Sequence, residues 1–155
     1  MTIWYRASPN KNTQITFSGE GGLYVAGRWN YVGRKVIYCS ESIALCTLEW
    51  LSHNGLSVSG FSYYKYSIDI PDDLISKFLP ADLPRNWHAT PAMDVNRDFA
   101  EQHLFLENKR LAIAVPSVIV PEEYNLIINP LHADFKKAAK TIENFGQFIA
   151  PNRDN

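Results

Sequence analysis

The sequence predicts a single α+β domain. Its strand-like segments are short apolar runs that prolines and turns separate. The helical segments are few and do not alternate regularly with strands, which disfavours a parallel βαβ sheet. The chain has 155 residues, of which 46% are hydrophobic, so it can bury one core without disulfides. We expect the domain to occupy residues 1–155, with its core at about 3–149 and a short polar tail behind it.

The first segments predict two strands with a glycine-rich loop between them. Aromatic residues favour a strand over Thr2–Arg6, and Pro9-Asn10 then turns the chain. The run Ser18–Gly22 is expected to form a loop, and the backbone N–H groups of such loops can approach phosphate oxygens. β-branched and aromatic residues predict the second strand over Lys35–Cys39.

A helix is predicted directly after the second strand, from Ser42 to His53. Ser40 is expected to cap its N-terminus, with Glu41 in the first turn, and Gly55 is expected to end it. Apolar residues occupy nearly every side of this helix, which predicts that it is buried.

Glu49 is the acidic residue of this helix. An unpaired buried carboxylate is costly, so Glu49 needs a partner, and Arg28 and Tyr38 are the nearest polar candidates along the chain. An acid, a cation and a phenol near one strand-to-helix turn indicate a functional site. The alternative is a structural ion pair between Arg28 and Glu49.

The middle of the chain predicts a third strand over Phe61–Ile70, broken by the following proline, with a turn of helix over Asp72–Phe78. Leu79–Pro91 is expected to be an irregular loop that Trp87 holds in place.

A second helix is predicted from a Thr90 cap and Pro91 in the first position to about Asn108. Its expected apolar stripe contains Val95, Phe99 and Leu106, with Ala100 and Leu104 adjacent.

The C-terminal third predicts further short strands. Leu111–Val115 and Val118–Val120 are expected to form a strand pair, or one bent strand that passes through Ser117. Tyr124–Ile128 is another strand, and Phe135–Asn144 has the residue types of a helix.

Composition argues against several classes of protein. The net charge is −1 and no basic cluster exceeds Lys136-Lys137, so direct nucleic-acid binding is not favoured. Cys39 and Cys46 lack CxxC spacing, which favours a reducing compartment. No apolar segment reaches membrane-spanning length, so we expect a cytoplasmic protein without membrane attachment. No metal is expected, because the histidines have no metal-ligand spacing: His88, His103 and His132.

A series of motifs, in matching order over nearly the whole chain, resembles the RES domain family, toxins of bacterial toxin–antitoxin pairs. The motifs are Tyr5-Arg6, SGEG at 18–21, GRWN at 27–30, IYCS at 37–40, the Glu49 helix, Trp87, VPSVIVP at 115–121 and YNLIINPLH at 124–132.

The resemblance implies an ADP-ribosyltransferase-like fold, a split and twisted β core with a cleft for NAD. NAD is then a substrate, and no separate cofactor is expected. The resemblance also favours irregular chain after Pro130, followed by a short strand near Phe145–Phe148.

Four residues carry over from the family motifs as catalytic: Arg28, Tyr38, Glu49 and Ser117. Cleavage of the nicotinamide–ribose bond builds positive charge on the sugar, which a fixed carboxylate such as Glu49 would stabilise. Arg28 would bind diphosphate or ribose oxygens. Tyr38 would offer a flat face to the nicotinamide or a hydroxyl to the ribose, and Ser117 would supply a small hydrogen-bonding group to the substrate.

A second group of residues is expected to bind substrate: Arg6, Ser18, Gly19, Trp29, Asn30 and Asn129. Asn129 has a second interpretation, because an asparagine before a proline also caps strand ends.

We therefore expect a toxin that consumes NAD as a glycohydrolase or phosphorylase. The alternatives are an ADP-ribosyltransferase that modifies a host protein and a non-catalytic binding module. The resemblance implies a cognate antitoxin with an Xre-like helix-turn-helix domain, which inserts a terminal segment into the cleft and contacts Arg28. A homodimer is kept as an alternative to a monomer.

Overall fold

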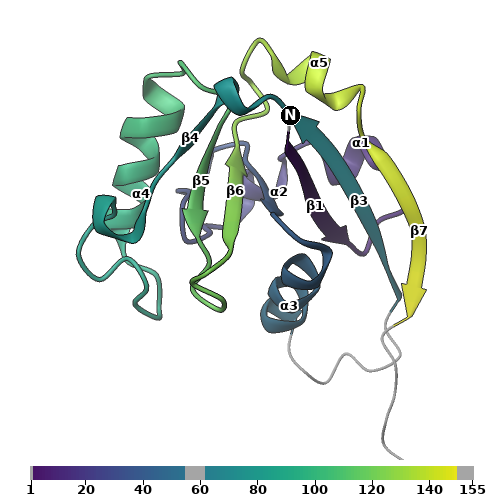
Figure 1. Ribbon diagram of the computed structural model, residues 1–155, viewed down its shortest axis with the longest axis horizontal. Coiled ribbons are helices and arrows are strands. Elements are labelled where there is room, and N and C mark those ends of the chain that lie inside the picture. The colour runs from purple at the N-terminus through teal and green to yellow at the C-terminus, as the bar shows by residue number, and fades with distance from the viewer. Residues whose placement is uncertain (1, 55–61, 150–155) are drawn as a thin grey trace, which may run out of the picture.

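The computed structural model describes residues 2–54 and 62–149, which contain one seven-stranded sheet (Figure 1). The strand order across the sheet is β4-β5-β6-β2-β1-β3-β7. The strands are β1 (Thr2–Ser8), β2 (Ile37–Ser40), β3 (Ser62–Ile70), β4 (Ile75–Lys77), β5 (Ala112–Pro116), β6 (Tyr124–Ile128) and β7 (Glu143–Ile149).

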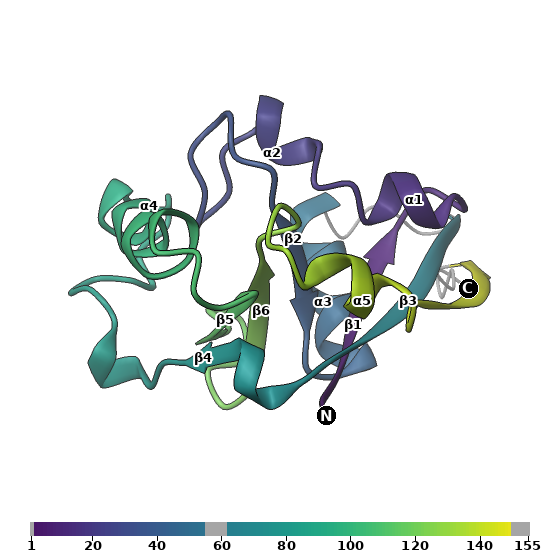
Figure 2. The ribbon, with the colours of Figure 1, turned by 90° about the horizontal axis from the view of Figure 1, so that it is seen from above.

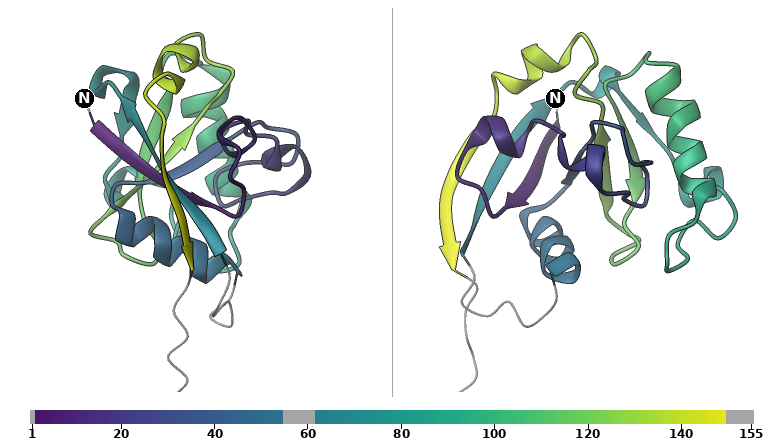
Figure 3. Two further views of the ribbon diagram at one scale, coloured as in Figure 1. Left: turned by 90° about the vertical axis from the view of Figure 1, so that its right-hand side faces the viewer. Right: turned by 180° about the vertical axis from the view of Figure 1, so that it is seen from behind.

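Short helices surround the sheet, with α4 near one end of the molecule and β7 at the other (Figures 1 and 2). Figure 3 shows α3 below the sheet and α5 above it, in both further views. The helical segments are α1 (Thr13–Thr16), α2 (Gly21–Tyr24), α3 (Ile43–Asn54), α4 (Asp94–Ala100), its π-helical continuation (Glu101–Leu106) and α5 (Phe135–Ala139), with 3-10 turns at Asp72–Leu74 and Pro80–Asp82. Mixed strands and helices in this order confirm the predicted α+β class.

The sheet is nearly split between β1 and β2. These strands pair at one position only, Tyr5 opposite Ser40, whereas β1 pairs with β3 along its whole length. Arg6 closes the gap: its Nη1 donates to the carbonyl oxygen of Tyr38 at 2.8 Å, and its Nε donates to that of Thr16 at 3.0 Å. A side chain therefore replaces part of the missing ladder between the two halves.

Each face of the central strands packs into its own apolar cluster, because side chains alternate along a strand. On β2, Ile37 and Cys39 join the cluster that contains Trp4, Tyr66 and Leu126. Tyr38 lies on the opposite face, with the cluster that α4 covers: Trp29, Val36, Ala100, Leu104, Ile113, Val115 and Ile127.

The residue that caps α3 lies two positions later than predicted, and the helix begins at Ile43. Ser40 belongs to β2, and Ser42 supplies the cap, because its Oγ accepts a hydrogen bond from the backbone N–H of Leu45 at 3.0 Å. The predicted cap at Ser40 is therefore wrong. Serine favours the capping position in both cases, but Ser40 pairs with β6 as the last residue of β2.

The prediction that α3 is buried on all sides is also wrong. Only Leu45 and Cys46 are buried, and Leu48 stays 45% exposed. One face of the helix packs on β1 and β2 while the other faces outward. The predicted stop at Gly55 lies outside the described residues, as do Phe61 at the start of the third predicted strand and the tail after residue 149.

The second predicted helix starts at Asp94 and not at the Thr90 cap. Its predicted stripe is wrong at Val95 and Leu106, which are 41% and 70% exposed, whereas the adjacent Ala100 and Leu104 are buried. The buried face is Asn96, Ala100, Leu104 and Phe105, because the π-helical turn after Ala100 shifts the side-chain register.

Three further differences concern short segments. Ile75–Lys77 forms β4, parallel to β5, where a turn of helix was expected to continue. Residues 118–120 form bends and no strand. Phe135–Ala139 is helical and Glu143–Ile149 is a strand, so each expectation for this region holds for part of it.

Among the described helices, none combines the length and the apolar character needed to cross a membrane.

Candidate active site

Glu49 lies where α3 meets the ends of β5 and β6. Its Oε1 accepts a hydrogen bond from the Oγ of Ser117 at 2.8 Å and another from the Nδ2 of Asn125 at 2.6 Å. These partners are 68 and 76 residues away along the chain. The polar partners of Glu49 are therefore not the two predicted from proximity in sequence.

Ser117 follows β5 directly and is completely buried. Its Oγ accepts hydrogen bonds from the backbone N–H groups of Ile119 and Val120, at 3.0 and 3.1 Å, and its hydroxyl hydrogen points to Glu49. A hydroxyl has one donor and two acceptor positions, so Ser117 has all three in use. The structure thus places Ser117 as a support of Glu49.

Asn125 completes this group and was missed in the sequence. Its Oδ1 accepts a hydrogen bond from the Oγ of Ser40 at 2.7 Å, directly across the β2–β6 ladder. The sequence does contain a signal that could identify Asn125, because it is the polar residue of an otherwise apolar strand, YNLII. A polar side chain there needs a partner on the neighbouring element.

A second set of contacts fixes the start of α3 against the loop that carries Ser117. Ser42 donates to Oε1 of Glu123 at 2.6 Å. Glu41 and Tyr124 exchange two hydrogen bonds: Glu41 N–H donates to the Tyr124 carbonyl at 3.0 Å, and Tyr124 N–H donates to Oε1 of Glu41 at 2.8 Å. These contacts set the distance between Glu49 and its supports.

Arg28 is held by the loop before α4. Its Nη1 donates to the carbonyl oxygens of Trp87 and Ala89, at 3.0 and 2.7 Å. Burial lowers the pKa of Arg28, and the charge of Glu49 opposes that shift. The two side chains attract each other but form no ion pair, so the alternative of a structural Arg28–Glu49 pair is wrong.

Tyr38 supports the turn that carries Arg28. Its hydroxyl donates to Oδ1 of Asn30 at 2.6 Å and accepts from the backbone N–H of Trp29 at 3.2 Å. Burial raises the pKa of Tyr38 well above its ordinary value, so the phenol is neutral. Both hydrogen bonds of the hydroxyl are therefore made within the protein.

Asn30 and Trp29 both act within the same turn. Asn30 is 1% exposed, its Nδ2 donates to the carbonyl oxygens of Val25 and Tyr31, both at 3.1 Å, and its Oδ1 accepts from Gly27 N–H at 2.8 Å. Trp29 is 3% exposed and packs in the α4 cluster. Their observed contacts are structural.

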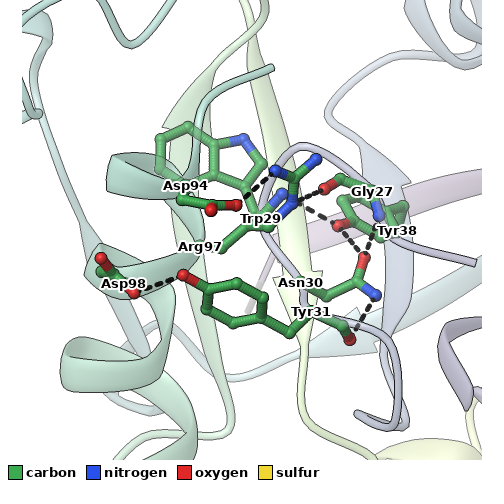
Figure 4. A network of polar contacts seen from close by, with 8 residues as sticks. All are labelled: Gly27, Trp29, Asn30, Tyr31, Tyr38, Asp94, Arg97 and Asp98. Carbon is green, nitrogen blue, oxygen red and sulfur yellow. Dashed lines mark hydrogen bonds and ion pairs between the residues drawn. The ribbon is translucent and has the colours of Figure 1, made fainter. Parts of the chain in front are cut away.

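Arg97 is a second cation near Arg28 that no sequence motif marks. Figure 4 shows it reaching from α4 to the GRWN turn, where its Nε donates to the Gly27 carbonyl at 2.9 Å while Nη1 pairs with Asp94 at 2.9 Å. Its charge acts on Arg28 and contributes to the lowered pKa of that residue. A second guanidinium group therefore lies at the turn that carries Arg28.

Tyr31 adds another link between the turn and α4. Its hydroxyl donates to Oδ1 of Asp98 at 2.5 Å (Figure 4). The turn that carries Arg28 is therefore tied to α4 at two points.

Arg6 lies in the split between β1 and β2, half-buried beside Cys39 and Cys46. Burial lowers its pKa. Among the described residues, no hydrogen bond reaches its Nη2, so this nitrogen has donor capacity left for a ligand.

The glycine-rich loop packs against the protein. Ser18 donates to the Ile15 carbonyl at 2.9 Å. Gly19 has φ +74°, and a Cβ there would meet Pro130 Cγ at 2.8 Å and the Val36 nitrogen at 2.9 Å. The loop is shorter than expected, because α2 begins at Gly21.

Asn129 caps a strand end, one of the two interpretations given above. Its Oδ1 accepts from Leu131 N–H at 3.1 Å and its Nδ2 donates to Asn108 at 3.2 Å.

Asn129 also lines a cavity of about 330 Å³ beside Arg34, and another cavity of about 290 Å³ lies near Trp4. Arg28, Glu49 and Ser117 line neither of these two cavities. The candidate site is therefore identified by its converging polar groups and not by the size of a cavity.

The arrangement combines an anchored carboxylate with anchored guanidinium groups. Glu49 can stabilise positive charge, while Arg28 and Arg97 favour an anion nearby. These are the requirements for a substrate that carries phosphates and develops a cationic centre.

Sequence comparison matches residues 3–147 to the model of the RES domain. The chain is 40% identical over 123 residues to the Prs ADP-ribosylating toxin of Sphingobium sp. strain YBL2, which covers 77% of this chain and 75% of that protein. It is 33% identical over 139 residues to Toxin Res of Yersinia enterocolitica, which covers 90% and 91% of the two chains.

Among solved structures, a chain of the Mycobacterium tuberculosis MbcT-MbcA toxin-antitoxin complex has a similar fold, with a TM-score of 0.69. The superposition covers 97% of this chain and 84% of that one at 16% identity.

Proposed function

The chain belongs to the RES domain family, and on that premise we propose that it is the toxin of a toxin–antitoxin pair that consumes NAD. The bond that breaks joins nicotinamide to ribose. The observation that carries this proposal is the anchored carboxylate of Glu49, whose Oε1 accepts hydrogen bonds from Ser117 and Asn125 in a site that also contains Arg28.

Glu49 stabilises the transition state in this proposal. As nicotinamide leaves with the bonding electrons, positive charge develops on the ribose ring. A carboxylate that is already fixed in place needs no reorganisation when that charge appears, which lowers the barrier. Ser117 holds the carboxylate and does not contact the substrate.

Arg28 and Arg97 bind the diphosphate of NAD in this proposal. Arg28 uses Nη1 for the carbonyl oxygens of Trp87 and Ala89, so its position is set before the substrate arrives. An anion beside both guanidinium groups would relieve their mutual repulsion. The ring face of Tyr38 packs against the nicotinamide, and Arg6 donates to the substrate through Nη2.

ADP-ribosylation of a protein is the second candidate. The 40% identity to a protein named Prs ADP-ribosylating toxin favours it. The same cleavage step serves both candidates, and only the acceptor differs: water or phosphate in the first, a protein side chain in the second.

Purified protein and NAD labelled in the adenylate portion separate these candidates. Release of nicotinamide with no added protein supports the first. Nicotinamide release that requires a cell extract, with label on one protein band, supports the second. No change in NAD under either condition would overturn both and leave a binding module.

We further propose a cognate antitoxin with an Xre-like DNA-binding domain. It would place a terminal segment in the cleft, with a carboxylate on Arg28. The similar fold in a toxin-antitoxin complex supports an antitoxin partner. Expression of the chain alone should deplete cellular NAD, and co-expression with the neighbouring reading frame should restore it. Normal NAD in cells that express the chain alone would contradict the proposal.

A further inference from the structure

We propose that Asn125 is a positioning residue for catalysis, which fixes the carboxylate of Glu49 through Oε1 and leaves Oε2 for the substrate. This inference rests on the proposed NAD cleavage. Asn125 does not need to contact NAD itself, because its effect passes through Glu49.

The direction of the Asn125 amide is determined by its two neighbours. An ionised carboxylate can only accept hydrogen bonds, so the amide must turn Nδ2 toward Glu49, 2.6 Å away. That places Oδ1 toward Ser40, whose hydroxyl donates to it at 2.7 Å. A flipped amide would bring two acceptor oxygens together, so the chain Ser40–Asn125–Glu49 has one favourable arrangement.

Glu49 is half-buried on α3, where the fully buried side chains are Leu45 and Cys46. Two hydrogen bonds to Oε1, one from Ser117 and one from Asn125, therefore fix the carboxylate. They reach it from the ends of two different strands, which restrains rotation about the last side-chain bond.

Oε2 is the oxygen available for the substrate. Within residues 2–54 and 62–149, no hydrogen bond reaches it. The two carboxylate oxygens thus have different roles: Oε1 is held by the protein, and Oε2 is available to the substrate.

Asn125→Asp tests this inference by changing one donor into an acceptor of the same shape. At neutral pH the introduced carboxylate would repel Glu49 and displace it, so kcat should fall by ~100-fold. At lower pH the pair shares a proton, the introduced carboxyl group donates to Glu49, and it still accepts from Ser40. The ratio of variant to wild-type kcat should therefore rise at least ~10-fold between pH 8 and pH 5.5.

The pH dependence separates positioning from a merely structural role. Asn144→Asp is the matched control: it adds the same charge on exposed β7 and keeps the acceptor for Gly146 N–H, so its kcat should follow the wild type. A loss in Asn125→Asp that stays constant with pH, or no loss at all, would overturn the inference.

Ser40→Ala provides a second variant if Asn125→Asp does not fold. It removes the hydroxyl that donates to Oδ1 of Asn125, so the amide is held less firmly against Glu49. The kcat should drop several-fold while KM for NAD stays the same; an unchanged kcat would overturn the inference. Glu49→Gln is measured alongside. If Glu49→Gln is inactive while Asn125→Asp has the same kcat and pH dependence as the wild type, this inference alone is overturned. If the wild-type protein releases no nicotinamide, the proposed function is overturned and this inference with it.

Discussion

Gly27 and Tyr38 lie so close together that a Cβ atom at position 27 would stand 2.5 Å from the phenol oxygen. The same atom would stand 2.6 Å from Oδ1 of Asn30. Both oxygens belong to the hydrogen bonds that shape the turn before Arg28. The glycine of the GRWN motif is therefore needed for close approach, although its φ is not in the left-handed region.

Gly27→Ala should break this turn. The added methyl group displaces a buried phenol, which should cost about 1–3 kcal/mol of unfolding free energy and lower NAD turnover as Arg28 shifts. Urea unfolding and nicotinamide release measure the two effects. Gly21→Ala is the control, since no atom lies within 4 Å of a Cβ there, and it should behave as wild type. Equal stability of the two variants would contradict the prediction.

Glu49→Gln should abolish most turnover and keep the fold. The amide oxygen can still accept from Ser117 and Asn125, but the negative charge is lost. We expect kcat to fall ~100-fold or more, the scale of one preorganised electrostatic group. Glu122→Gln, at an exposed position three residues before Asn125, is the control. Turnover within a few-fold of wild type would remove Glu49 from the chemistry.

Arg28→Lys should weaken NAD binding. A lysine ammonium could satisfy the carbonyl oxygens of Trp87 and Ala89, but it lacks the planar fork that would also bind a diphosphate. The Kd for NAD should rise ~10-fold or more, as calorimetric titration would measure. Exposed Arg85→Lys keeps the same chemistry elsewhere and should bind normally. Full affinity in the Arg28 variant would make Arg28 a structural residue.

Alkaline pH should destabilise the protein through Cys46. Burial raises the pKa of this thiol from 9.0 to about 11. Between those values the unfolded chain releases a proton that the folded protein keeps, so stability is present below pH 9 and is lost as pH rises toward 11. Each pH unit in that window costs up to about 1.4 kcal/mol.

Urea unfolding at several pH values would measure this loss. Cys46→Ala lacks the thiol and should lose less stability between pH 9 and pH 11, whatever its stability at pH 7. Parallel curves for the variant and the wild type would show that another group is responsible.

The sequence predicted local elements well where one pattern dominated. Tyr124–Ile128 has the predicted bounds, because an apolar run between turns has few other solutions. The cap of α3 was predicted wrongly because Ser40 and Ser42 have equal local propensity, and the choice depends on pairing with β6. The α+β class survives such errors, since it depends on the kinds of element and their order.

The candidate site was harder to predict than the fold. Glu49 was identified as important, but its partners come from strands almost 70 or more residues away, and one sequence has no pattern that specifies such contacts. Arg97 was missed for the same reason, because only the packing of α4 brings it to Gly27. The burial assigned to α3 was wrong because its apolar residues were assumed to face protein on all sides.

The single residue pair between β1 and β2 also bears on folding cooperativity. The β1-β3-β7 half and the β4-β5-β6-β2 half share little backbone ladder, so Arg6, α3 and the apolar cluster that contains Trp4 and Leu126 couple them. Native-state hydrogen exchange should then resolve two protected units that open with different free energies. Arg6→Met, which keeps the apolar stem and removes the bridge, should widen that difference; identical opening energies in both halves would contradict the prediction. The boundary between β1 and β2, which runs beside Glu49, would thus be the place where the protein opens locally.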